Sequence, residues 1–358
     1  MMIKPVVTKG ENPEEVIKRL EKEIAETPHH KGTDHHLGRL KAKIARLKEE
    51  KQNQLFRRHR GGRGGFAMKK TGEATIVLVG PPSVGKSTLL NQLTNAESKV
   101  GDYDFTTLNV IPGMMAYRGA KIQLLDLPGI IRGAALGKGK GKEILAVARA
   151  ADLILIIVDP KTLNQVKEIK KEINEAGIRL NQKKPQVIIN KKPAGGLKIN
   201  ASSNLKLSEV TIRALCEELR LVNAEITINE NIAAEQMIDT MLGNRVYLPS
   251  LTILNKSDLA DSLDVDLAIS ALKQINLEKL REKIWQKLKL IRVYSYADRQ
   301  EPFIIKQGKS LKELINDFMP GKIEIYKEAK IWGPGAKFPG QLVSLSFCPL
   351  DGTIVQFI

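Results

Sequence analysis

The sequence predicts an α/β fold built on a mostly parallel sheet, and three observations predict it. Near-continuous apolar segments at 74–80, 121–127, 153–159 and 247–256 have the length and composition of buried strands. Helical patterns lie between them, as in KEILAVARAAD at 142–152, and a glycine-rich turn directly follows the first strand. Strands that are apolar throughout belong to sheets covered on both faces, and strands that alternate with helices run parallel.

Length and charge restrict the class of protein. With 358 residues, 42% of them hydrophobic, the chain has material for two or three domains with packed cores. Lys and Arg outnumber Asp and Glu by 57 to 40, a net charge of +17, and residues 1–70 hold 18 of the former against 9 of the latter. Such an excess indicates a polyanionic partner, most often nucleic acid, and no preference for a DNA sequence is evident. A generally basic surface is the alternative.

The cysteines and the apolar runs predict where the protein works. Cys216 and Cys348 are far apart and outside any metal-ligand spacing, as expected in a reducing compartment. No apolar run reaches the roughly 18 residues that a membrane span needs, and the first residues are too polar for a secretory signal. We therefore expect a cytoplasmic protein without a membrane partner.

Residues 1–65 predict a basic helical region. Asn12 and Pro13 suit the first turn of one helix, and Thr33 suits the N-cap of a second. The second helix has its apolar residues at helical spacing, namely Leu37, Leu40, Ile44 and Leu47. It runs into RRHRGGRGG at 57–65, a flexible positive segment that suits contact with a phosphate backbone and also suits a plain linker.

The spacing of the later strands predicts the remaining domains. The interval between 153–159 and 247–256 is too long for one crossover helix, so we expect an inserted α+β subdomain at about 178–240 within an α/β domain of residues 66–289. From residue 290 the pattern changes to strand, turn, strand and helix. That order predicts a small β-grasp-like module over 290–358.

The turn after the first strand, GPPSVGKST, matches the P-loop pattern G-x-x-x-x-G-K-[S/T] between a strand and a helix. Backbone N–H groups of such a loop wrap the phosphates of a nucleotide. Lys86 is expected to reach the β- and γ-phosphates and Ser87 to ligate magnesium. The predicted phosphate-binding residues are Gly80, Pro81, Pro82, Ser83, Val84, Gly85, Lys86, Ser87 and Thr88.

A second motif, DLPG, ends the strand at 121–127. Asp126 lies where the acid of a magnesium shell belongs, and Gly129 is expected to offer its N–H to the γ-phosphate. Upstream, YDFTTL supplies Thr106 and Thr107, one of which would complete the magnesium shell in the triphosphate state. We favour Thr107, although the sequence alone does not choose between the two.

A third motif, NKSD at 255–258, predicts which base is bound. The Asp258 carboxylate suits the ring N–H and amino group of guanine, a donor pair that adenine lacks. Asn255 and Lys256 would brace the loop and stack over the base. Ser270 and Ala271 follow another short apolar stretch, and the Ala271 N–H would meet the guanine oxygen. Together the motifs predict binding of GTP or GDP with Mg²⁺.

On these residues the chain resembles the developmentally regulated GTP-binding proteins, a branch of the Obg-like translational GTPases. The resemblance runs through HHLGRLKAKIARLK, the segment GFAMKKTGEATIVLVGPPSVGKSTLLN, DYDFTTLNVIPG, LLDLPGIIRGAALGKGKGKEILAVARAAD and NKSD. The insert and VYSYADRQEPFIIKQGKSLKELI resemble that family's insert and its C-terminal TGS domain. The resemblance implies a P-loop GTPase fold, association with ribosomes or rRNA, and a partner protein that docks on the TGS domain.

The residue after Gly129 is Ile130, where Ras-like GTPases carry the glutamine that positions the attacking water. The resemblance implies a class with a hydrophobic residue there, and in several members of that class a potassium ion replaces the missing group. The usual potassium ligand is a P-loop asparagine, and this chain has Ser83 at that position. Catalysis would then come from such an ion or from a partner, and Arg132 is a weaker candidate. We expect slow hydrolysis in isolation, with Lys86, Thr107 and Gly129 as the catalytic residues.

Three functions fit these motifs. The leading one is a GTP-driven switch on the translation machinery. In it, Lys138, Lys140 and Lys142 of the second switch loop would couple RNA contact to the nucleotide state, and a solvated loop is the alternative for these lysines. The second is an RNA-binding or assembly scaffold in which GTP is mainly structural, a reading that the segment Arg57 to Arg63 supports. The third, an ATPase of the same superfamily, is disfavoured by Asp258.

Overall fold

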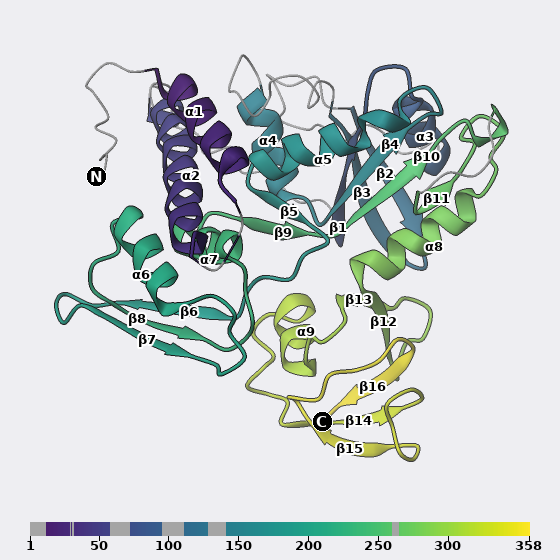
Figure 1. Cartoon of the computed structure of the whole chain (residues 1–358). Coiled ribbons are helices and arrows are strands. Elements are labelled where there is room, and N and C mark those ends of the chain that lie inside the picture. The colour runs from purple at the N-terminus through teal and green to yellow at the C-terminus, as the bar shows by residue number, and fades with distance from the viewer. Residues whose placement is uncertain are drawn as a thin grey trace, which may run out of the picture. The chain divides into compact units, whose positions relative to one another are not determined.

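The computed structural model describes residues 12–28, 30, 32–57, 72–94, 111–127, 141–259 and 265–358. The chain forms two compact units, each made of two stretches of sequence. The first unit combines Met1–Gly65 with Gln182–Tyr247, and the second combines Phe66–Asn181 with Leu248–Ile358 (Figure 1). Within the described residues, no helix has both the length and the apolar character needed to cross a membrane.

The second unit is built on a six-stranded sheet in the order β11-β10-β4-β1-β3-β2 (Figure 1). Neighbouring strands are parallel except at one edge, where β2 pairs antiparallel with β3. Its strands are β1 (Ala74–Val79), β2 (Ile111–Tyr117), β3 (Ala120–Asp126), β4 (Leu153–Val158), β10 (Ser250–Leu254) and β11 (Leu267–Ala268). The predicted α/β class, a mostly parallel sheet with helices, is confirmed.

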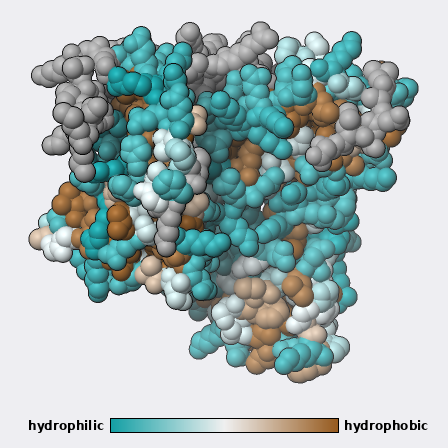
Figure 2. Space-filling view, viewed as in Figure 1, coloured by the Kyte–Doolittle hydropathy of each residue, from teal (hydrophilic) through white to brown (hydrophobic). Residues whose placement is uncertain are grey.

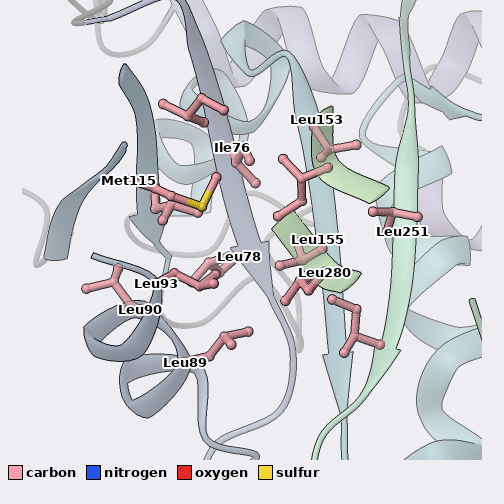
Figure 3. Packing of buried hydrophobic residues seen from close by; sticks show 14 of the residues in the cluster. Ile76, Leu78, Leu89, Leu90, Leu93, Met115, Leu153, Leu155, Leu251 and Leu280 are labelled. Atoms are coloured by element: carbon pink, nitrogen blue, oxygen red, sulfur yellow. The ribbon is translucent and has the colours of Figure 1, made fainter. Parts of the chain in front are cut away.

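Helices cover this sheet, which explains why its central strands are apolar throughout. They are α3 (Lys86–Leu93), α4 (Gly141–Ala150), α5 (Val166–Glu175) after the 3₁₀ turn η1 (Leu163–Gln165), and α8 (Leu277–Leu288). Every residue of β1 and β4 is buried. Ile76 and Leu78 pack with residues of α3 and α8 in one cluster, while Val77 and Val79 alternate to the other face (Figure 3). Two further short strands, β5 (Ile178–Leu180) and β9 (Val246–Leu248), flank the insert in the sequence.

The edge strand β2 was not expected, because its sequence IPGMMAY begins with breakers of regular structure. Proline lacks the N–H that a central strand needs, but an edge strand tolerates it. Gly113 has a packing reason: a Cβ there would lie 2.6 Å from the Thr94 side chain at the end of α3. Pro112 and Gly113, which predict a loop, therefore belong to an edge strand, which pairs with β3.

The C-terminal residues of this unit form a five-stranded sheet in the order β13-β12-β16-β14-β15, packed against one helix. The elements are β12 (Leu290–Ser295), β13 (Phe303–Lys306), α9 (Leu311–Phe318), β14 (Glu328–Trp332), β15 (Gln341–Ser344) and β16 (Thr353–Phe357). Ser310 and Glu313 form a capping box at the start of α9. Hydrophobic residues gather on the surface of this module (Figure 2). The exposed large hydrophobic residues of this part of the chain include Phe338 and Leu342.

This module contacts the α/β domain through apolar and charged residues of β13. Ile304 is buried in the same cluster as Trp285 and Leu288 of α8. Lys306 Nζ lies 2.7 Å from Asp152 Oδ1, and Asp152 Oδ2 accepts a hydrogen bond from the Thr75 N–H at the start of β1. One carboxylate of the α4–β4 turn thus contacts both the first strand of the sheet and the C-terminal module.

The first unit joins the N-terminal helices to the insert. Its elements are α1 (Pro13–Glu26), α2 (Asp34–Arg57), β6 (Val187–Lys191), β7 (Leu197–Ala201), α6 (Glu209–Glu218), β8 (Ala224–Ile228) and α7 (Ala234–Leu242). The three strands form a sheet in the order β6-β8-β7. As predicted, the Asn12 side chain caps α1 by accepting from the Glu14 N–H, and Pro13 begins the helix.

Helix α2 packs on two partners through two different faces. Leu40 and Ile44 pack with Val16 and Leu20 of α1, which is the face that the apolar spacing predicts. The other face carries small residues: Ala42 is fully buried in the core of the insert, and a Cβ at Gly38 would lie 3.0 Å from the Thr211 side chain. The N-terminal region and the insert, which the sequence predicts as separate parts, therefore share one hydrophobic core.

Candidate nucleotide-binding site

The predicted site residues lie at the carboxyl edge of the parallel sheet. The P-loop follows β1, Asp126 ends β3, Asp159 follows β4 and Asn255 follows β10. Because parallel strands bring their carboxyl ends to one edge, four segments spread over about half the chain meet there, as ligand sites of open α/β sheets do.

The P-loop glycines are required by close contacts. A Cβ at Gly80 would lie 2.1 Å from the Ile157 carbonyl oxygen, and one at Gly85 would lie 2.4 Å from Asn255 Nδ2. Gly85 also has φ +91°, a conformation that L side chains rarely adopt. Ser83 has φ +63° as well, although it carries a side chain. The loop therefore passes through left-handed conformations at Ser83 and Gly85.

Lys86, the first residue of α3, is held by the loop itself. Its Nζ donates hydrogen bonds to the carbonyl oxygens of Gly80 at 3.0 Å and Pro81 at 2.7 Å. Burial lowers the pKa of Lys86, and the nearby Asp126 carboxylate partly opposes that shift. A partly desolvated ammonium at this position interacts strongly with phosphate oxygens.

Ser87 and Asp126 form the predicted metal-ligand pair. The Ser87 hydroxyl donates to Asp126 Oδ2 at 2.9 Å, and Asp126 is only 5% exposed. Its other oxygen, Oδ1, is buried and has no hydrogen-bond partner in the described part of the chain. A buried carboxylate oxygen without a donor suits a hard divalent cation, so these two residues fit Mg²⁺.

Asn255 joins the predicted base-reading loops to the P-loop. Its side chain is 2% exposed; Nδ2 donates to the Val84 carbonyl oxygen at 2.8 Å, and Oδ1 accepts from the Ala271 N–H at 2.9 Å. The expected bracing role of Asn255 thus has a defined geometry. The Ala271 N–H, expected to meet the guanine oxygen, donates to Asn255 Oδ1 in this structure. A bound guanine would therefore share this N–H with Asn255 or replace Asn255 as its acceptor.

Lys256 is anchored by a residue that the sequence reasoning missed. Its Nζ donates to the Ser83 carbonyl oxygen and to Asp159 Oδ2, both at 2.8 Å. Asp159 also accepts from the Thr162 N–H and hydroxyl. Burial raises the pKa of Asp159, but the hydrogen bonds from Lys256 and Thr162 outweigh it and leave the pKa below its ordinary value. The only sequence signal was an acid directly after a buried strand.

Asp258 lies in the short turn η2 (Ser257–Leu259) after β10. Its carboxylate is engaged by Lys273, whose Nζ lies 3.1 Å from Oδ2, and by the Ser270 side chain. These hydrogen bonds, that of Lys273 first, lower the pKa of Asp258. Lys273 was also missed, since nothing in SALKQIN marks one lysine as a partner of a residue fifteen positions earlier.

Several predicted residues lie outside the described part of the chain. They are Thr106, Thr107, Gly129, Ile130, Arg132, Lys138 and Lys140, together with residues 58–65 of the basic segment. The described residues therefore contain the phosphate-binding, metal-binding and base-reading segments of the predicted site, while the two predicted switch loops stay predictions.

Comparison with protein families agrees with this geometry. Residues 75–191 match a model described as a 50S ribosome-binding GTPase, and residues 194–290 match the model for the C-terminal region of that domain. The first match contains the P-loop and Asp126, and the second contains Asn255 and Asp258.

Curated relatives match the chain over most of its length. A GTP-binding protein of Methanocaldococcus jannaschii is 45% identical, covering 96% of this chain and 92% of its own. A developmentally regulated GTP-binding protein 1 homologue of Dictyostelium discoideum is 40% identical, and developmentally regulated GTP-binding protein 2 of Homo sapiens is 37% identical. Each of these two matches covers 96% of this chain and 98% of the relative. The chain therefore belongs to the developmentally regulated GTP-binding proteins, a family of GTP-binding GTPases.

Proposed function

We propose that this chain is a GTP-hydrolysing molecular switch that acts with ribosomes or ribosomal RNA in the cytoplasm. The observation that carries the proposal is the hydrogen-bonded connection of Val84, Asn255 and Ala271 at one edge of the sheet. Through it, the segment proposed to bind phosphate is hydrogen-bonded to the segments proposed to read the base.

Each described residue has a role in this proposal. The P-loop N–H groups and Lys86 bind the phosphates, Ser87 and Asp126 hold magnesium, and Asp258 accepts hydrogen bonds from guanine. A magnesium ion held by Ser87 and Asp126 would neutralise part of the negative charge of the nucleotide phosphates. Lys256, fixed by Asp159, flanks the base and ties its loop to Ser83.

The hydrolysis step lacks the glutamine of Ras-like enzymes, since Ile130 follows Gly129. We propose that Thr107 and Gly129 contact magnesium and the γ-phosphate, and that Ile130 excludes water. The missing stabilisation would come from a potassium ion near Ser83 or from a partner. In both cases turnover by the isolated protein is slow.

The polyanionic partner is inferred from charge and family. The net charge of +17 favours binding to RNA. The matched family model is described as ribosome-binding, which supports the ribosome as the partner. We further propose that residues 290–358 are a TGS domain, whose exposed apolar residues, such as Phe338 and Leu342, suit a protein partner.

The test measures GTP hydrolysis by the purified protein in KCl and in NaCl, with and without ribosomes. Stimulation by potassium alone assigns the missing catalytic group to a bound ion, and stimulation only by ribosomes assigns it to the partner. Co-sedimentation with ribosomes in GTP, GDP and no nucleotide tests the switch. Equal sedimentation in all three would contradict it.

The scaffold function remains a second candidate because the most basic part of the sequence, residues 1–65, belongs to a different compact unit from the nucleotide site. Removing residues 1–65 would also remove Ala42 from the core of the insert, so that deletion does not isolate the role of charge. The cleaner test replaces Lys86 with Ala. Unchanged RNA binding by that variant in every nucleotide state supports the scaffold.

A further inference from the structure

The carboxylate expected to read guanine is already engaged by a lysine of the same chain. Lys273 Nζ lies 3.1 Å from Asp258 Oδ2, and the Asp258 side chain is only 16% exposed. The Lys273 side chain is 58% exposed, so its ammonium approaches the carboxylate from the solvent side. This contact lies inside the base-reading site rather than beside it.

The backbone around Lys273 is fixed in a way that keeps the lysine there. Ser270 and Ile275 pair through two hydrogen bonds, of 3.2 and 3.0 Å, that close the turn between them. The Lys273 N–H donates to the Ser270 hydroxyl oxygen at 3.3 Å, and Gln274 takes a left-handed conformation with φ +56°. The turn follows β11, which pairs with β10 directly before the Asp258 segment. Lys273 is thus held on a closed turn opposite Asp258.

The chemistry of guanine makes this contact competitive. The ring N–H and the amino group of guanine donate to the two oxygens of one carboxylate, in the plane of that carboxylate. An ammonium on Oδ2 takes acceptor capacity from one of those two bonds and reduces the negative charge that strengthens both. Guanine therefore exchanges with Lys273 or binds a carboxylate that is a weaker acceptor.

The two lysines near the base differ in this respect. Lys256 donates to a backbone carbonyl oxygen and to Asp159, neither of which is expected to read the base. Lys273 has its described ion pair with Asp258 itself. Of these two lysines, only Lys273 stabilises the Asp258 carboxylate in the nucleotide-free state, and this is the carboxylate that guanine needs.

We propose that Lys273 competes with guanine for Asp258 and thereby weakens the binding of both GDP and GTP and speeds their release. The inference rests on the proposed role of Asp258 in guanine recognition. An ion pair with one exposed partner shifts an equilibrium by a factor of up to about five. The competitor therefore adjusts nucleotide affinity without abolishing it.

The experiment measures the affinity and the release rate of a fluorescent GDP derivative by stopped flow. Lys273→Ala and Lys273→Gln are expected to bind GDP about two- to fivefold more tightly and to release it more slowly than the wild type, while Lys273→Arg stays close to the wild type. Lys279→Ala, an exposed lysine of α8, removes the same charge without touching Asp258 and is the matched control.

Salt and a second variant sharpen the result. Raising the ionic strength weakens the ion pair, so the wild type approaches Lys273→Ala as salt increases. In an Asp258→Asn background, the effect of Lys273→Ala on GDP affinity disappears. A positioning role for Lys273 predicts the reverse: weaker GDP binding by Lys273→Ala, rescued by Lys273→Arg. That outcome, or an effect equal to that of Lys279→Ala, overturns the proposal.

Failure of the underlying function is distinguishable from failure of this inference. If the wild type binds ADP as tightly as GDP, Asp258 does not read guanine, and both proposals fall together. If the wild type prefers GDP and loses that preference in Asp258→Asn, the recognition role stands, and the Lys273 variants alone decide the competition.

Discussion

Replacing Asn255 with alanine tests how far the site depends on one buried side chain. The change removes both hydrogen bonds of the amide and leaves the Val84 carbonyl and the Ala271 N–H without their partners. Asn255 is 2% exposed, so water replaces those bonds poorly. An unpaired buried polar group costs about 1–3 kcal/mol, and the two together reduce the free energy of unfolding of this unit by about 2–6 kcal/mol.

The same change separates the phosphate-binding loop from the base-reading loops. We expect Asn255→Ala to lower GDP affinity at least about tenfold, because the nucleotide must then hold together loops that the amide had joined. Asn255→Asp keeps an acceptor for the Ala271 N–H but places a second oxygen against the Val84 carbonyl. It should be no better than the alanine variant.

The assay uses a feature of this sequence. The chain has two tryptophans, Trp285 and Trp332, and both belong to the second unit. Tryptophan fluorescence during urea unfolding therefore follows this unit, and titration with fluorescent GDP gives the affinity. The control is Asn204→Ala, an exposed asparagine of the insert. If Asn255→Ala matches that control in both measurements, the connection through Asn255 is not what holds the site together.

Three further predictions follow from contacts described above. The pKa of Asp159 is lower in the folded chain than in the unfolded chain, where it is about 4. The ionised carboxylate therefore stabilises the fold above about pH 4, and this stabilisation is lost as the pH falls through the folded-state pKa. The difference in urea stability between the wild type and Asp159→Ala should shrink below about pH 4. Gly80→Ala places a Cβ 2.1 Å from a backbone oxygen and should cost about 2 kcal/mol or more, seen as a lower melting temperature with weaker GDP binding. Burial raises the pKa of Cys216 to about 11, whereas Cys348 is exposed, so a thiol reagent at pH 8 should modify one cysteine quickly and the second only after unfolding.

Contiguous motifs could be predicted from the sequence, because their residue types are required by one ligand. The P-loop, Asp126 and Asn255 to Asp258 were all found, and the structure places them at one edge of the sheet. The apolar strands were also predicted, since burial on both faces leaves an unbroken run of Ile, Leu and Val.

Contacts between distant residues could not be predicted in the same way. Asp159 and Lys256 are 97 positions apart, and either residue alone looks like an ordinary surface charge. Pro112 and Gly113 indicate a loop unless the neighbouring strand and α3 are known. The second face of α2 consists of Gly38 and Ala42, which give no hydrophobic signal although Ala42 is fully buried. Small residues mark close packing only once the partner helix is placed.

The shared core of α2 and the insert has a consequence for synthesis of the protein. Ala42 leaves the ribosome long before the α6 and α7 residues that cover it, which end at Leu242, are translated. At about 5–20 residues per second, that interval lasts on the order of ten to forty seconds. Throughout this time the N-terminal helices have only each other to pack against, and the nucleotide site also waits for Asn255. Both units are therefore completed late in translation, because the first needs residues up to Tyr247 and the second needs residues from Leu248 onward.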